Sequence, residues 1–236
     1  METKDRIIVA LDVPSLGQAG QLIDELAPHV GCFKVGLELL TAEGGPEVVR
    51  FVHEHGGEVF YDGKFCDIPN TVGNAAKVVA RLGVKMFNVH ASAGMKAIEA
   101  AVANKGNSLV LGVTVLTSID ADECVSIFGD QPAIKVKQFA QMLADAGADG
   151  IICSPKELEA LADFNLLKIT PGVRPEWADA GDQKRVMTPA EAIRAGATAL
   201  VIGRPITKPP TEIGTPADAA ANICLEIWNA TKQQQP

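Results

Sequence analysis

The stretch E-V-F-Y-D-G-K-F-C-D-I-P-N-T, residues 58–71, runs from an apolar strand-like segment into the start of a predicted helix. Between the two lie three charged side chains, Asp62, Lys64 and Asp67, within six positions. A solvated turn with an incidental ion pair would explain them, and so would an active site at the end of a buried strand. The remainder of the chain has to distinguish these two interpretations.

Apolar runs like the one at 58–65 recur along the chain, and segments with apolar residues three or four apart lie between them, a spacing that indicates helices. Several of these helices end in glycine just before the next apolar run, as at Gly83, Gly147 and Gly196. The predicted strands are 7–13, 32–39, 58–65, 86–91, 108–116, 150–154, 166–172 and 199–203.

Eight alternations of strand and helix in 236 residues predict an α/β fold, a single (β/α)₈ TIM barrel over residues 1–236. A doubly wound open sheet is the alternative, but no G-x-G-x-x-G motif follows the first strand. No segment indicates a domain boundary. The proline-rich stretch 205–216 is interpreted as a loop, and a short tail from about residue 231 is expected to be frayed.

The composition restricts the class of protein. The net charge is −8 and the pI about 5.0, which disfavours nonspecific binding to nucleic acid or to an anionic membrane. The five cysteines are scattered and contain no C-x-x-C pair, so neither a disulfide framework nor a zinc site is predicted. The N-terminus lacks the apolar segment of a signal peptide, and no apolar run is long enough to span a membrane. We therefore predict a cytoplasmic protein.

Polar side chains fall at the carboxyl ends of nearly all predicted strands, where TIM barrels place their active sites. The opposite strand ends are mostly preceded by glycine, which a barrel with two equally solvated rims would not show. The rim residues are Asp12, Lys34, Asp62, Lys64, His90, Thr117, Ser118, Ser154, Arg174, Gln183, Gly203 and Arg204.

The alternation of side chains along a strand places Asp62 and Lys64 on one face, about 6.5 Å apart along the strand. Lys34, on the preceding strand, is expected to point to the same interior. Lone inward lysines are costly, but lysines beside carboxylates form a mutually neutralising network. Such a network can be purely structural, so its position at the rim is what favours function.

A second group lies in the last two strand-to-helix connections, in I-T-P-G-V-R (169–174), D-Q-K-R (182–185) and V-I-G-R-P (201–205). In TIM barrels these connections often bind phosphate. Gly203 allows close approach of the backbone, Arg204 offers two parallel donors, and Gln183 can donate from the side. A glycine turn beside a surface arginine is the alternative.

The motif D-G-K-F-C-D-I-P-N-T resembles the D-x-K-x-x-D-I-P-x-T signature of the orotidine 5′-phosphate decarboxylase family, and the resemblance extends over essentially the whole chain. D-x-K-x-x-D alone also occurs in related sugar-phosphate enzymes, so the specificity lies in the combination. Further matching motifs are V-A-L-D at Asp12, F-K-V-G at Lys34, N-V-H-A at His90, L-T-S at Thr117, T-P-G-V-R at Arg174 and V-I-G-R-P-I-T at Arg204.

The resemblance implies decarboxylation of orotidine 5′-phosphate to UMP and CO₂, the last step of UMP synthesis, with no cofactor and no metal. It implies that Lys64 is the proton donor and that Lys34, Asp62 and Asp67 complete an alternating Lys-Asp-Lys-Asp array. It also implies a homodimer in which Asp67 and Thr71 reach the neighbouring subunit's site.

The resemblance further implies how the substrate is held. Asp12 and Lys34 match residues that hold the ribose hydroxyls, and Thr117 matches a ligand-contacting residue. Gln183 is implied to bridge toward the base. The implied phosphate contacts are Arg174, Gln183, Gly203 and Arg204.

These residue types suit the reaction, because loss of CO₂ from C6 leaves a carbanion that the ring cannot delocalise, so a fixed cation must stabilise it. Three alternatives stay open. One is a Mg²⁺-dependent sugar-phosphate decarboxylase or synthase of the same superfamily. The second is an aldolase in which Lys64 forms a Schiff base. The third is a non-catalytic barrel that binds a phosphate ligand.

Overall fold

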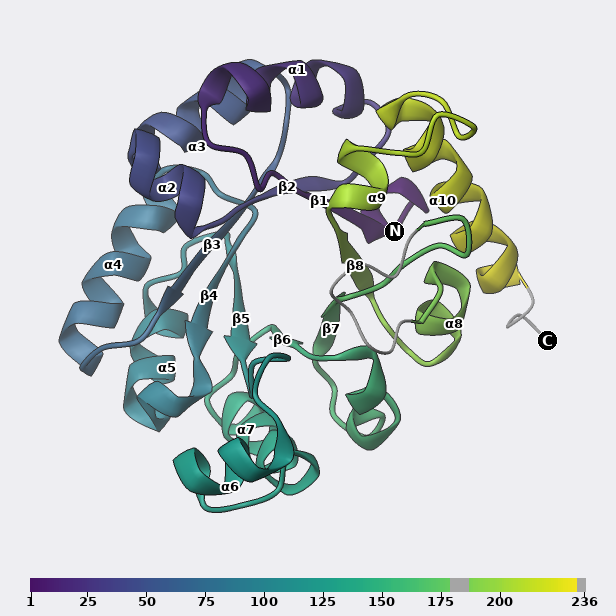
Figure 1. The fold of residues 1–236 in the computed structure, drawn as a ribbon. Helices are drawn as coiled ribbons and strands as arrows, with labels where there is room; N and C mark the ends of the chain where they lie inside the picture. Colours follow the sequence, from purple (N-terminus) through teal and green to yellow (C-terminus); the bar gives the residue numbers. More distant parts are fainter. Residues whose placement is uncertain (179–186, 233–236) are drawn as a thin grey trace.

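The computed structural model describes residues 1–178 and 187–232, and Figure 1 shows a ring of strands enclosed by helices. Eight parallel strands pair in sequence order, and β1 pairs with β8 to close the barrel. The TIM-barrel prediction is therefore confirmed. The strands are β1 (Ile7–Ala10), β2 (Cys32–Val35), β3 (Val59–Phe65), β4 (Met86–His90), β5 (Leu109–Val113), β6 (Gly150–Ile152), β7 (Leu167–Pro171) and β8 (Ala199–Ile202).

Helices follow most strands and form the outer layer of the barrel (Figure 1). None of the helices in the described residues has the length and apolar character needed to cross a membrane. The helices are α1 (Leu16–Leu26), α2 (Leu37–Glu43), α3 (Gly45–Glu54), α4 (Pro69–Arg81), α5 (Met95–Ala103), α6 (Ala121–Phe128), α7 (Pro132–Asp145), α8 (Pro189–Arg194), α9 (Arg204–Thr207) and α10 (Pro216–Lys232). Short 3₁₀ turns are η1 (Lys4–Arg6), η2 (Ala91–Ala93), η3 (Pro155–Glu157) and η4 (Glu159–Leu161).

Several predicted elements differ from the structure, and the predicted strand 7–13 ends already at Ala10. The predicted strand 32–39 contains β2 and then the start of α2, because a short apolar run does not distinguish a strand from one face of a helix. The predicted strand 108–116 continues past β5 because Val115 and Leu116 are apolar for another reason: they line a cavity. The stretch 205–216 is not entirely loop, since it includes most of α9.

Two separate hydrophobic clusters build the core. The larger lies between the strands and the helices. The smaller fills the barrel interior and consists of alternate strand residues, among them Ile8, Cys32, Phe60 and Met86. This inner cluster closes the barrel below the carboxyl ends of the strands, so polar side chains one step further along the same strands must lie at the rim.

The packing of α7 against β5 explains one glycine of the strand motif S-L-V-L-G-V. A Cβ atom at Gly112 would overlap the side chain of Leu143, which is fully buried. Glycine at this position therefore lets the helix approach the sheet closely. The barrel wall beside the site depends on this contact, because Val113 follows directly and faces the cavity described below.

Candidate active site

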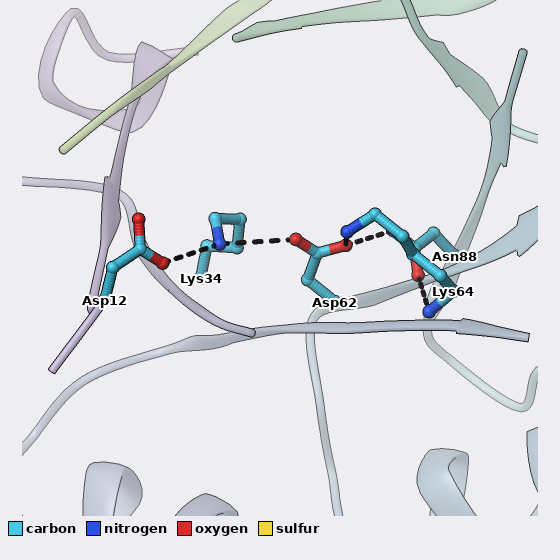
Figure 2. Close-up of polar contacts among 5 residues, drawn as sticks. All are labelled: Asp12, Lys34, Asp62, Lys64 and Asn88. Atoms are coloured by element: carbon cyan, nitrogen blue, oxygen red, sulfur yellow. Dashed lines mark hydrogen bonds and ion pairs between the residues drawn. The ribbon is translucent and has the colours of Figure 1, made fainter. Parts of the chain in front are cut away.

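Four charged side chains form a row across the carboxyl-terminal rim, in the order Asp12, Lys34, Asp62 and Lys64 (Figure 2). Lys34 Nζ lies 3.2 Å from Asp12 Oδ1 and 3.2 Å from Asp62 Oδ2. Lys64 Nζ lies 2.7 Å from Asp62 Oδ1. The charges alternate in sign along the row, so each ammonium group is next to at least one carboxylate.

The barrel's side-chain alternation produces this row. Lys34 follows Cys32 by two positions on β2, and Asp62 follows Phe60 by two positions on β3, so both project into the interior above the inner apolar cluster. The parallel register pairs Lys34 with Phe60. Asp62 therefore lies one step further toward the rim, on the neighbouring strand. The contact predicted between Asp62 and Lys64 is present.

Because the network is buried, the loss of one of its charged partners is expected to lower the stability of the fold substantially. The Asp62 side chain is only 9% exposed, and that of Lys34 is 14% exposed. Removing one partner of a buried ion pair typically costs about 3–5 kcal/mol, because the other charge is left without compensation. Asp62 has an ammonium on each side, so the pair of lysines satisfies a carboxylate that water barely reaches.

Lys64 has an unusual backbone. Its φ is 49°, the one positive value at a non-glycine residue in the described part of the chain. The register between β3 and β4 shifts between Tyr61 and Phe65, so the strand is irregular where it carries Lys64. A left-handed conformation costs a non-glycine residue roughly 1–2 kcal/mol. Simple alternation along the strand did not predict this distortion.

Asn88 is a site residue that the sequence reasoning missed. It lies in the middle of β4, is fully buried, and contacts both Asp62 and Lys64 (Figure 2). The signal was present in M-F-N-V-H, where Asn88 alternates with Met86 and His90 on the inward face. The sequence motif N-V-H-A was assigned through His90 at the strand end, and the amide two residues earlier was not predicted to belong to the site.

A cavity of about 170 Å³ lies beside the row. Lys34, Asp62 and Lys64 form its charged side. Most of the other lining residues are apolar, and Thr117, which the sequence predicted to contact a ligand, is also among them. The lining residues include Phe60, Val113, Val115, Leu116, Ile152, Pro171 and Val201. The cavity therefore combines a mostly apolar lining with the ammonium groups of two lysines.

A second cavity, of about 430 Å³, is lined by Asp12, Gly203 and Arg204, and also by Gln18 and Lys208. The ion pair between Asp12 and Lys34 connects it to the first cavity, because Asp12 lines one and Lys34 the other. The structure thus brings Gly203 and Arg204 next to Asp12, with the ammonium of Lys34 between the two cavities.

Gly36 provides room for this connection. A Cβ atom there would lie 3.1 Å from Lys34 Nζ and 3.7 Å from Asp12 Oδ1. A larger residue would push the ammonium away from its carboxylate or force the backbone to shift. This is a physical reason for glycine in the F-K-V-G motif.

Three other predicted site residues, Asp67, Thr71 and Arg174, line neither of the two cavities. Asp67 and Thr71 are exposed, and Asp67 Oδ1 accepts a hydrogen bond from the backbone N–H of Ile68 at 2.7 Å. Arg174 lines neither cavity, but its backbone N–H donates to Met187, beside a bridge between Val173 and Met187. Gln183 lies outside the described residues.

His90 ends β4 and is half-buried. Burial lowers its pKa from the ordinary value of 6.5, and the nearby Lys64 ammonium lowers it further, while Asp62 acts in the opposite direction. His90 is therefore uncharged at neutral pH. This places a neutral imidazole, not a third cation, next to the row.

This lowered pKa leads to a prediction on stability. Below about pH 6.5 the unfolded chain gains a proton at His90 before the folded chain does, so the free energy of unfolding should decrease as pH falls. Urea unfolding at pH 7.5 and 5.5 should show a smaller decrease in His90→Gln than in the wild type. His29→Gln, at an exposed position, is the control. Equal pH dependence in all three proteins would contradict the prediction.

Within residues 1–178 and 187–232, no group of three His, Cys, Asp or Glu side chains is arranged to hold a metal ion. The carboxylates of the row are instead occupied by lysines.

The row, the two linked cavities and the barrel can be compared with known proteins. The sequence model of the Orotidine 5′-phosphate decarboxylase / HUMPS family matches residues 5–216. The chain belongs to this family. The predicted resemblance is thereby confirmed, and with it the assignment of the chain as a decarboxylase of this family, involved in pyrimidine biosynthesis.

Individual relatives agree over nearly the full length. The orotidine 5′-phosphate decarboxylase of Moorella thermoacetica is 47% identical, over 96% of this chain and 94% of the relative. That of Syntrophomonas wolfei is 41% identical, over 96% and 99%. The crystal structure of orotidine 5′-phosphate decarboxylase from Lactobacillus acidophilus superimposes with a TM-score of 0.80 at 34% identity, covering 94% of this chain and 98% of that one.

Proposed function

We propose that the chain converts orotidine 5′-phosphate to UMP and CO₂, the final step of UMP biosynthesis, without a metal or an organic cofactor. The observation that carries the proposal is the position of Lys64: its ammonium is bound to Asp62, and both residues line a mostly apolar cavity. The family membership supports the substrate, since the named relatives are orotidine 5′-phosphate decarboxylases.

The chemistry proceeds in two steps. The bond between C6 and the carboxylate breaks heterolytically, CO₂ leaves, and the electron pair stays on C6 in the plane of the ring. Lys64 stabilises this carbanion electrostatically and then transfers a proton from Nζ to C6, after which it regains a proton from solvent. Asp62 lies beside the departing carboxylate and orients Lys64, with which it is in contact.

The two cavities suggest how the nucleotide lies. The pyrimidine ring occupies the apolar cavity with Thr117 at its edge, and the phosphate lies toward Gly203 and Arg204. The ribose then passes the ion pair of Lys34 and Asp12, whose polar atoms suit its hydroxyls. Arg174 and Gln183 are assigned to the phosphate side by the same proposal.

The proposal is tested by mixing the purified protein with orotidine 5′-phosphate in EDTA and following the ultraviolet absorbance as orotate becomes uracil. A rapid change that EDTA does not slow supports the cofactor-free reaction. Activity that requires Mg²⁺, or turnover of sugar phosphates alone, would favour the superfamily alternative. Trapping of a Schiff base at Lys64 by borohydride would favour an aldolase.

We further propose a cytoplasmic homodimer in which Asp67 and Thr71 complete the partner's site. Both residues are exposed in the single chain, and Asp67 makes no contact with the row that its motif implies it should join. The face of α4 that carries Thr71 also exposes Val78 at 54%, and Ile68, just before the helix, is 66% exposed. An apolar face beside unused site residues fits a second copy of the chain.

Hybrid dimers test this arrangement. Lys64→Ala and Asp67→Ala are each expected to lose activity, but a mixed dimer would hold one site with both native residues. Random reassortment should therefore restore about one quarter of the wild-type activity, since half the dimers are hybrids with one intact site each. No recovery after confirmed subunit exchange would show that Asp67 acts within its own chain or not at all.

A further inference from the structure

Asn88 is a polar residue of the site that carries no charge and is not a member of the row of charged side chains. Its side chain is fully buried on the inward face of β4, above Met86 of the inner apolar cluster. A buried amide needs partners for its oxygen and for its N–H groups. Both kinds of partner are supplied by β3, and both belong to the site (Figure 2).

The hydrogen bonds have defined directions. The backbone N–H of Lys64 donates to Asn88 Oδ1 at 2.7 Å, and Asn88 Nδ2 donates to Asp62 Oδ1 at 2.6 Å. The chemistry of the partners fixes the orientation of the amide, because a backbone N–H can only donate and a carboxylate can only accept. The same Asp62 oxygen accepts from Lys64 Nζ at 2.7 Å.

Asn88 thus constrains both the backbone and the side-chain ammonium of Lys64. It holds the backbone N–H directly, at a position where the strand register is interrupted and φ is 49°. It holds the ammonium indirectly, by fixing the carboxylate oxygen to which Nζ is bonded. The left-handed conformation persists because a buried side chain captures the N–H that the shifted ladder does not pair.

We propose that Asn88 is the positioning residue of this active site: it sets the backbone of Lys64 and the carboxylate of Asp62, and so aims the ammonium at the reacting carbon. The inference rests on the proposed function. Asn88 lines neither cavity. Its loss should therefore reduce kcat and leave ligand affinity nearly unchanged, in contrast to a residue that holds the substrate.

Asn88→Ala and Asn88→Asp test the two hydrogen bonds of Asn88, to the backbone N–H of Lys64 and to Asp62 Oδ1, in different ways. The alanine variant lacks both, and we expect kcat to fall about 100-fold while the Kd for UMP changes less than about threefold. Asn88→Asp keeps an acceptor for Lys64 N–H but places a second carboxylate against Asp62. Two carboxylates in contact share a proton. The activity of Asn88→Asp should thus recover as pH falls, when its protonated carboxyl can donate to Asp62.

Ser108→Ala is the matched control. Ser108 is also a buried polar residue, and its hydroxyl donates to the carbonyl of Val84 at 2.6 Å, at the amino-terminal end of the barrel. It should lose stability without losing kcat. If folded Asn88→Ala retains a kcat within threefold of Ser108→Ala, or if Asn88→Asp has the wild-type pH profile, Asn88 is merely structural and the inference is wrong.

A failure of the proposed function would give a different result from a failure of this inference. The wild-type protein itself would then not convert orotidine 5′-phosphate, independently of the role of Asn88. A crystal structure of the better-folded Asn88 variant then still tests the inference. Lys64 should leave the left-handed region or lose its contact with Asp62. Retention of both features would overturn the positioning role without any activity measurement.

Discussion

Lys64→Ala is expected to reduce kcat by about 10⁵-fold, a loss of roughly 7 kcal/mol of transition-state stabilisation. Two contributions should disappear together, because in the proposed mechanism the same Nζ atom stabilises the carbanion and supplies the proton. A positioned acid contributes about 10²–10⁴-fold and a fixed electrostatic contact about 10²–10³-fold. The measurement is single-turnover decarboxylation of orotidine 5′-phosphate by the variant and the wild type.

The fold should survive this change. Asp62 keeps its contacts with Lys34 at 3.2 Å and with Asn88 at 2.6 Å, so the buried carboxylate is not left alone. The Kd for UMP should therefore change by less than about tenfold, since the lost contact acts mainly in the transition state.

Lys105→Ala is the control for loss of a lysine from an ion pair. Its Nζ lies 2.6 Å from Asp149 Oδ2, outside both cavities of the site, and its removal should leave kcat unchanged. Normal turnover by a folded Lys64→Ala protein would remove Lys64 from the mechanism, and the row would have to be interpreted as structural.

The sequence predicted this part of the site because it obeys a local rule. Side chains two apart on a strand share a face, so Asp62 and Phe60 point inward together, and Lys34 follows Cys32 in the same way. The same periodicity, repeated eight times with helices between, predicted the barrel. Regular alternation within each strand was enough to place charged residues at one rim.

What the sequence did not predict depends on contacts between strands. The left-handed backbone of Lys64 exists because the register of β3 against β4 shifts, and Asn88 accepts the N–H at that point. Neither feature can be predicted from the alternation of side chains within the sequence of β3. The strand ends were overextended for a related reason: Val115 and Leu116 are apolar because they line a cavity, and apolar character alone does not report which surface a residue covers.

Arg204→Ala is expected to reduce kcat/KM by about 10³-fold, roughly 4 kcal/mol, chiefly through a higher KM. Arg204 is exposed at the start of α9 and lines the cavity that also contains Asp12 and Gly203. An arginine can hold a phosphate through two parallel charge-assisted bonds. This contact lies far from the breaking bond, so it binds substrate and transition state alike.

Ligand pairs distinguish this role from a general loss of structure. Arg204→Ala should weaken binding of UMP by about 10²–10³-fold and leave the affinity for uridine, which lacks the phosphate, unchanged. Lys208→Ala removes another cation from the same cavity and should change KM by less than about threefold. A flexible, exposed ammonium cannot form the two parallel hydrogen bonds that a guanidinium gives to a phosphate. An unchanged KM in Arg204→Ala would remove Arg204 from the phosphate site. An equal loss for UMP and uridine would mean that the arginine supports the cavity wall and does not hold the phosphate.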